Sequence, residues 1–423
     1  MFGSYNRNTT SGKTKKRRLP IFTIALLVCY LGVSVFFFTY GFGEGRISAD
    51  AASEPKSLER IPLVVEIPVI VEEPTIVEPI ALPPPVQVKG IWVGAWFIVE
   101  PGRLDNFIDL CETTEINTLV IDIKDEYGHV TIPMDSDNFP VNQNILLENM
   151  GEIIEDLKSR GIYTIARVPC FKDSRRSERA PEFAHRNTDG NLWRDPRGYA
   201  WLNPYEEENW DYIAQICLQA ARLGFDEIQL DYVRFPVEGI RSMRDPKGDD
   251  ERTYAEVVAE FITFIRDTML EVGVRTSADV FGIIAISDRD ARLLGQELPL
   301  LLPALHYISP MIYPSHFANI RQNGTGQIIN GKLFETPDKE PYDVIYNTLQ
   351  HFLRAMDPDS TDQAIIRPFL QDFTAGYLGE GMFIPYGAEE VRAQIQAVYD
   401  AGLHEWILWS NHSRYSEDAF RNP

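Results

Sequence analysis

The chain has 423 residues, of which 44% are hydrophobic and 24% are charged, as is ordinary for a globular protein with a buried core. Its formal net charge is −22, although every charged residue among the first twenty is positive. The remainder is therefore more acidic than the total, and its field would repel nucleic acid and polyanionic glycans. Length alone fits either several average domains or one large barrel.

The four cysteines and seven histidines do not indicate a metal site. Cys29 lies in an apolar run, whereas Cys111, Cys170 and Cys217 are far apart and lack the Cys/His spacing typical of zinc ligands. We therefore expect no metal and no cofactor. We expect the last three cysteines to be buried small hydrophobic residues, with Cys170 of most interest because it lies near the end of a predicted strand.

Residues Ile21 to Phe42 form an uncharged run of about 22 residues, long enough for a helix across the roughly 30 Å hydrocarbon core of a membrane. The basic cluster Lys15 to Arg18 before it should stay cytoplasmic, which sends the rest of the chain outside. We predict a basic cytoplasmic tail (1–20), a single-pass membrane anchor (21–42) and an extracytoplasmic catalytic domain. A cleaved signal peptide, with a site near residues 49–51, is the alternative.

Residues 43–88 are predicted to form an extended Pro-rich linker. Prolines recur at near-regular intervals from Pro62 to Pro79 and are followed by the triplet at 83–85, which is incompatible with helix. At about 3.1 Å per residue, such a spacer could hold the next domain on the order of 100 Å from the membrane. Alternatively, its Val/Ile runs could pair with the domain as an edge strand.

From Lys89 to the C-terminus, apolar β-rich runs alternate with amphipathic helical stretches. Helices are predicted at Leu146–Arg160, Glu206–Leu223, Glu251–Val272 and Ala388–Ala401. Eight strands are predicted, at Gly90–Phe97, Thr118–Lys124, Tyr163–Phe171, Glu227–Phe235, Arg275–Gly282, Tyr307–Tyr313, Ile365–Phe373 and Glu405–Asn411. Eight such units, without a Gly-rich phosphate turn after the first strand, favour an α/β TIM (β/α)8 barrel over a doubly wound open sheet.

The connections of the predicted barrel are asymmetric. Helix-to-strand turns are short and contain a glycine able to end a helix, as at Gly161 and Gly224. Strand-to-helix connections are long, notably residues 172–205, 236–250 and 317–340, and carry polar, aromatic and Gly/Pro residues. Because these connections gather at the C-terminal face of a parallel barrel, we expect the functional site there.

The segment from Gly224 to Pro236 carries the clearest chemical signal. Its apolar residues alternate with Gln229 and Asp231, so on a strand both polar side chains point into the barrel. An unpaired carboxylate is costly there, and Arg234 is a candidate counter-ion that would keep Asp231 ionised. Asp231 is then either a nucleophile or acid/base group, or one half of a structural ion pair.

This segment belongs to a series of ordered motifs that resembles a known family. The block Gly198–Pro204, the Trp210-Asp211-Tyr212 motif and the Asp231 segment are similar to a bacterial domain of unknown function that is regarded as a glycoside hydrolase domain. Further matching segments are Gly90-Ile91-Trp92, Val120–Asp125, Asp279–Gly282, Ser309–Pro314 and Leu408-Trp409. The resemblance covers about Gly90 to Phe420 and implies a barrel related to the α-amylase-like glycosidases, without defining a substrate.

The resemblance also implies catalytic residues. In that wider clan the nucleophile is an aspartate on the fourth strand, an acid lies on the fifth, and a carboxylate on the seventh stabilises the transition state. Asp231, Asp279 and Asp372 stand at those places. Asp279 departs from the pattern, because the acid of α-amylase-like enzymes is a glutamate with one methylene more reach, and it could instead cap the next helix.

Residues near the predicted strand ends supply candidate substrate contacts, because aromatic faces stack on sugar rings while polar groups bind hydroxyls. We predict substrate-binding roles for Trp96, Asp122, Asn203, Tyr232, Arg234, Tyr313, Gln371 and Trp409. The alternatives are core packing for the aromatic residues and loop hydrogen bonding for Asn203 and Gln371. For Asp122 the alternative is a buried bridge to Lys124 or to a neighbouring strand.

These observations predict hydrolysis of glycosidic bonds in an extracellular or cell-envelope polysaccharide, with Asp231 as nucleophile and Asp279 as general acid/base. A non-catalytic glycan-binding or envelope-organising barrel is one alternative, and a transglycosylase or lyase using the same carboxylates is another. The acidic composition favours neutral or basic glycans over polyanions.

Overall fold

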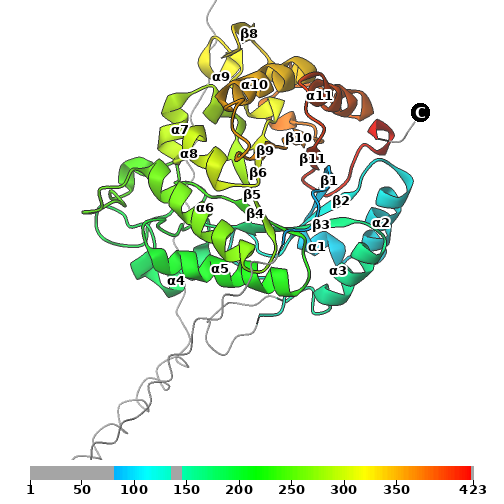
Figure 1. The fold of residues 1–423 in the computed structure, drawn as a ribbon. Coiled ribbons are helices and arrows are strands. Elements are labelled where there is room, and N and C mark those ends of the chain that lie inside the picture. Colours follow the sequence, from blue (N-terminus) through cyan, green and yellow to red (C-terminus); the bar gives the residue numbers. More distant parts are fainter. Residues whose placement is uncertain (1–80, 135–144, 421–423) are drawn as a thin grey trace, which may run out of the picture. The chain divides into compact units, whose positions relative to one another are not determined.

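The computed structural model of the chain describes residues 81–134 and 145–420 (Figure 1). The predicted tail, the membrane anchor and most of the linker lie outside the described residues. Within the described ranges, no helix combines the length and the apolar character needed to cross a membrane. The last linker residues belong to the barrel domain, because Val88 is buried and the Pro83 carbonyl accepts a hydrogen bond from Arg275.

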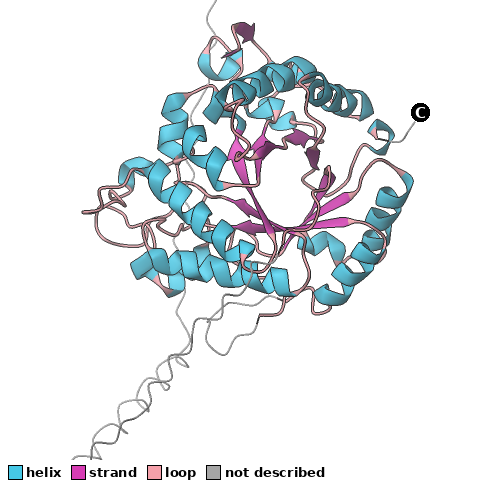
Figure 2. Ribbon diagram, in the orientation of Figure 1, coloured by secondary structure: helices cyan, strands magenta, loops and turns pink. Residues whose placement is uncertain are grey.

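The strands close into a parallel barrel, as predicted. They pair in the order β10-β11-β1-β2-β3-β4-β5-β6-β9, and β10 also pairs with β6 to complete the ring. The bounds are β1 (Lys89–Val93), β2 (Thr118–Asp122), β3 (Tyr163–Pro169), β4 (Glu227–Asp231), β5 (Arg275–Phe281), β6 (Tyr307–Met311), β9 (Ile365–Ile366), β10 (Phe369–Gln371) and β11 (Trp406–Trp409). Figure 2 shows this ring of strands enclosed by helices.

The helices pack their apolar faces onto the outside of the barrel. On α6, the longest helix, Val257, Phe261 and Ile265 are spaced four residues apart on one face, and all three are fully buried. The bounds are α1 (Ala95–Ile98), α2 (Arg103–Thr113), α3 (Met150–Ser159), α4 (Ser174–Arg179), α5 (Glu207–Arg222), α6 (Tyr254–Leu270), α7 (Asp288–Leu294), α8 (Leu298–Leu301), α9 (Ile320–Asn323), α10 (Pro341–Ala355) and α11 (Ala388–Asp400). An antiparallel hairpin of β7 (Gln327–Ile329) and β8 (Lys332–Phe334) lies in the loop after β6.

All eight predicted strand positions are present, but the predicted ends were too late. β1 stops at Val93 because the next residues turn into α1, and β4 stops at Asp231, where Tyr232 takes a left-handed φ of 49°. The seventh position is split into β9 and β10 around Pro368, which has no N–H to donate to a sheet.

The cysteines occupy apolar surroundings. Cys170 and Cys217 are fully buried free thiols, as predicted. Cys111 is only partly buried, and burial raises the pKa of its thiol to about 12. Cys29 lies outside the described residues.

The N-terminal end of the barrel interior is filled by a buried ion pair. Arg367, from the break between β9 and β10, contacts Glu227 at the start of β4, and neither side chain is exposed to solvent. The guanidinium also lies 3.6 Å from Glu405 and 4.2 Å from the centre of the Tyr307 ring. Removing the Glu227 charge leaves the buried Arg367 with only the more distant Glu405, which costs more than the pair contributes.

We expect Glu227→Gln to lower the free energy of unfolding by about 3 kcal/mol or more, because Arg367 then loses its main partner. The double variant Glu227→Gln/Arg367→Met should recover much of that loss. Urea unfolding followed by circular dichroism measures both, with Glu251→Gln on the surface as the control. Equal stability of the Glu227→Gln variant and the control would contradict this account.

Candidate active site

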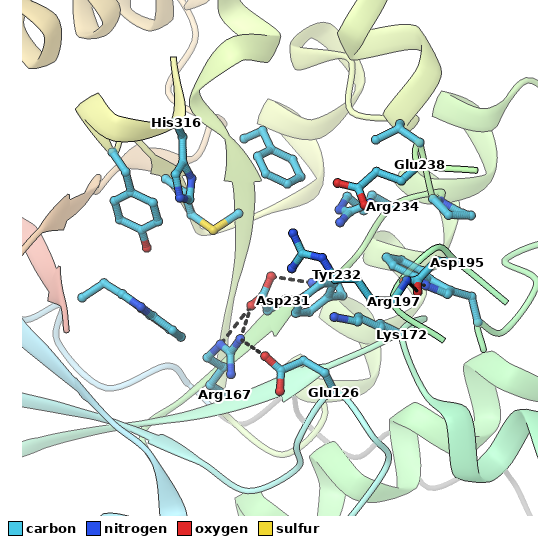
Figure 3. A pocket seen from close by; sticks show the side chains of 17 residues that line it. Glu126, Arg167, Lys172, Asp195, Arg197, Asp231, Tyr232, Arg234, Glu238 and His316 are labelled. Carbon is cyan, nitrogen blue, oxygen red and sulfur yellow. Dashed lines mark hydrogen bonds and ion pairs between the residues drawn. The ribbon is translucent and has the colours of Figure 1, made fainter. Parts of the chain in front are cut away.

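A cleft opens at the C-terminal ends of the strands, where it was predicted. One cavity of about 480 Å³ is lined by residues from β3, β4, β5, β6 and β11 and from the long loops after β3 and β4 (Figure 3). Its lining comprises Glu126, Arg167, Lys172, Asp195, Arg197, Trp201, Asp231, Tyr232, Arg234, Pro236, Val237, Glu238, Phe281, Met311, Tyr313, His316 and Trp409. A second cavity of about 630 Å³ shares seven of these residues and continues past Phe373, Tyr377 and Asn411, so the two form one elongated cleft.

The floor of the cleft is organised by Arg167 of β3, which is only 2% exposed. Its Nη1 donates to Asp122 Oδ1 at 2.7 Å, and its Nε donates to Asp231 Oδ2 at 3.0 Å. Its Nη2 also contacts Asp231 and lies 4.0 Å from Glu126 Oε1. Asp279 Oδ2 stands 3.9 Å from the Nε atom. One buried cation thus faces four carboxyl groups from different strands and loops.

Arg167 is the counter-ion of Asp231, and the prediction that Arg234 fills this role was wrong. On β3 and β4, Arg167 and Asp231 both point into the barrel, and the strand register brings them together. Arg234 comes after the strand has ended, so its side chain is carried outward. It lies 4.8 Å from the Trp201 ring and 4.9 Å from the Phe281 ring instead.

Asp231 is held from two sides while it reaches the cleft. Its Oδ2 accepts from Arg167, and its Oδ1 accepts from the backbone N–H of Tyr232. Tyr232 itself has a left-handed backbone, a conformation that non-glycine residues seldom adopt. This carboxylate is therefore fixed in one orientation at the cavity wall, a common property of reacting groups.

Asp279 lies beneath the cleft and does not line it. Its side chain is about 2% exposed, and its Oδ1 is buried without a hydrogen-bond partner. Burial, followed by the negative charge of Asp231, raises the pKa of Asp279 well above its ordinary value. The structure thus places a buried carboxyl group with a raised pKa near Asp231.

Asp122 is also buried and is not among the residues that line the cleft. Trp92 Nε1 donates to its Oδ1 at 2.8 Å, and the same oxygen accepts from Arg167. This is the bridge to a neighbouring strand, whereas Lys124 pairs with Asp173 at 3.0 Å. Burial raises the pKa of Asp122 to about 6, against the opposing effect of the Arg167 charge.

Five of the predicted site residues line the cleft, namely Asp231, Tyr232, Arg234, Tyr313 and Trp409. Trp409 stacks on Trp92 with ring centroids 4.0 Å apart and also faces Arg167, whose guanidinium carbon is 5.2 Å from its ring. The floor and one wall of the cleft are therefore joined by aromatic contacts.

Four other predicted residues lie outside the cleft lining. Asp372 accepts from the backbone N–H and the hydroxyl of Ser416, both at 2.8 Å. Gln371 accepts from the Ser315 N–H and donates to Asp338. The side chains of Asp372 and Gln371 thus connect neighbouring loops by hydrogen bonds. Asn203 donates to the Pro246 carbonyl at 3.1 Å, and Trp96 is 51% exposed on α1; neither is among the residues that line the cleft.

The prediction missed Arg167, Glu126 and Lys172. Arg167 is a charged residue inside an otherwise apolar strand, the same signal that singled out Asp231. Glu126 follows β2 four residues after Asp122, among the polar residues Lys124 and Asp125. Lys172 follows β3 directly and had no motif to distinguish it.

Comparison with known proteins decides the family. Residues 90–415 match the family described as "Putative glycosyl hydrolase domain". The chain belongs to this family. No curated protein sequence matches the chain.

Solved structures agree on the fold. The glycoside hydrolase domain of PgaB (BpsB) from Bordetella bronchiseptica is similar with a TM-score of 0.56 and 14% identity, over 78% of this chain and 95% of that one. A hypothetical protein from Ruminiclostridium thermocellum is 34% identical over 45% of this chain and 97% of its own, with a TM-score of 0.39. The first likeness shows the barrel alone, since the identity is low.

A carboxyl titration tests the raised pKa of Asp122. In protein labelled with ¹³C at aspartate carboxyls, one signal should titrate near pH 6 and be absent from Asp122→Asn. Because this pKa is raised relative to the unfolded chain, the stability that Asp122 contributes is full below about pH 4 and falls as the pH rises through 6. Absence of any Asp122-dependent titration between pH 5 and 7 would contradict the assignment.

Proposed function

We propose that the chain hydrolyses glycosidic bonds in a polysaccharide of the cell envelope or the extracellular medium, with Asp231 as the reacting carboxylate. The observation that carries the proposal is that Asp231 is fixed by Arg167 and by the Tyr232 amide while it borders an aromatic-lined cleft. A carboxylate in this position can attack an anomeric carbon or activate a water molecule. The extracytoplasmic location rests on the predicted anchor.

The form of the cleft supports a polymeric substrate. The two cavities share Tyr313 and Trp409, and the second extends toward Phe373 and Tyr377. Aromatic faces spaced along an elongated cleft suit consecutive sugar rings better than a single small molecule. A chain bound along this path would pass over Asp231 at the floor.

A glycosidase also needs an acid to protonate the leaving oxygen, and Glu126 has the better geometry for this role. It lines the cavity, its side chain is 35% exposed, and Figure 3 shows it beside Arg167, across from Asp231. Asp279, to which the family resemblance assigns the role, is buried below the floor. We therefore propose that Glu126 donates the proton and that neutral Asp279 positions Asp231.

Asp231→Asn should reduce the release of reducing ends from a susceptible polysaccharide at least about 1,000-fold while leaving the circular dichroism spectrum unchanged. The assay uses a panel of bacterial envelope and neutral polysaccharides. Asp109→Asn, an exposed change on α2, is the matched control. Glycan binding by both proteins without any product from the wild type would favour the non-catalytic barrel instead.

Glu126→Gln should lower kcat about 100-fold or more on natural glycans but much less on aryl glycosides, whose leaving groups need no protonation. Asp279→Asn is tested in parallel. If that variant shows the leaving-group dependence and Glu126→Gln does not, the acid is Asp279.

A further inference from the structure

Lys172 is a buried cation that has no acidic partner among the described residues. It is only 7% exposed, yet within the described part of the chain its ammonium group has no hydrogen bond and no carboxylate within 4.0 Å. It rests over the rings of Tyr199 and Tyr232, at 4.0 and 4.7 Å from their centres, and lines the cleft. Figure 3 shows it on the wall beside Asp231.

Two further cations stand on the same wall. Arg234 uses one guanidinium N–H on the Phe235 carbonyl at 3.0 Å, and it lies between the rings of Trp201, Tyr232 and Phe281. Arg197 is exposed at the rim and lines both cavities. Among the described residues, neither guanidinium has a carboxylate within ion-pair distance, although 21 ion pairs occur elsewhere in that part of the chain.

The carboxylates nearby act on these cations through their charge but form no ion pair with them. Asp195 is engaged in its own loop, since Oδ1 accepts from the backbone of Arg197 and Tyr199 and Oδ2 accepts from Trp201 Nε1 at 3.1 Å. Glu238 is exposed at the rim, and Glu126 faces Arg167. Desolvation is the main cause of the lowered pKa of Lys172, a cost that a bound anion would offset.

We propose that Lys172, Arg234 and Arg197 form a subsite for an anionic group on the substrate glycan. The inference rests on the proposed function and names its substrate class, a sugar that carries a carboxylate, sulfate or phosphate group next to the cleaved bond. The ammonium and the guanidinium groups supply charge-assisted hydrogen bonds to such a group. The net charge of −22 argued for neutral or basic glycans, but this part of the cleft presents three cations that form no ion pair within the described residues.

Binding of single sugars to the purified protein tests the subsite without any hydrolysis. The probes are D-glucuronate, D-glucose 6-sulfate and D-glucose 6-phosphate, each compared with D-glucose by isothermal titration calorimetry. At least one anionic sugar should bind about tenfold or more tightly than glucose, and the preference should weaken with added salt. Which of the three is preferred identifies the kind of anion.

The variants connect the preference to the residues. Lys172→Met fills a similar volume against the two tyrosine rings and should reduce the preference for the anionic sugar over glucose about tenfold. Arg197→Gln, an exposed change, should reduce this preference severalfold. Arg241→Gln, an exposed arginine outside the cleft, should leave it unchanged. If no anionic sugar binds more tightly than glucose, or if both cleft variants keep the full preference, the subsite is overturned.

The outcome is separable from that of the proposed function. If the protein prefers anionic sugars but cleaves no glycan, the hydrolase proposal is wrong and the subsite proposal stands. If the wild type cleaves a glycan but binds no anionic sugar more tightly than glucose, the hydrolase proposal stands and the subsite proposal is wrong.

Discussion

The site depends on one buried guanidinium. Arg167 lies inside the barrel, where a single charge would be too costly to keep, and it is stabilised by carboxylates that would be equally costly without it. Asp122 and Asp231 come from strands on either side of β3, so their mutual attraction to one cation also fixes the strand ends around the cleft floor. Catalytic geometry and barrel closure thus share one set of contacts.

Distance from Arg167 separates the acidic groups by function. Asp231 is close enough to be held by direct hydrogen bonds, whereas Asp279 is 3.9 Å away, is buried, and has its pKa raised by that burial and by the Asp231 charge. Similar side chains within one cluster therefore have different surroundings, and burial raises the pKa of Asp279. Such divergence is what acid and base chemistry at one pH requires.

The cleft combines this acidic floor with a cationic wall. Lys172 and Arg234 lie against aromatic rings rather than against carboxylates, so the wall keeps its positive charge. The long loop after β3 supplies much of it, and the same loop uses Asp195 for its own hydrogen bonds. A chain with a strongly acidic total charge can thereby present cations without ion pairs to a ligand.

Strand periodicity, turn glycines and loop lengths were enough to predict the barrel, its eight strand positions, the face that bears the cleft and the inward position of Asp231, because each is a local consequence of chain geometry. Which side chains meet across the barrel is not local. The pairing of Asp231 with Arg167, the burial of Asp279 and the use of Asp372 by Ser416 depend on strand register and on where each strand ends. Residues separated by more than forty positions are brought within hydrogen-bond distance only when the ring closes, so those choices belong to the tertiary structure.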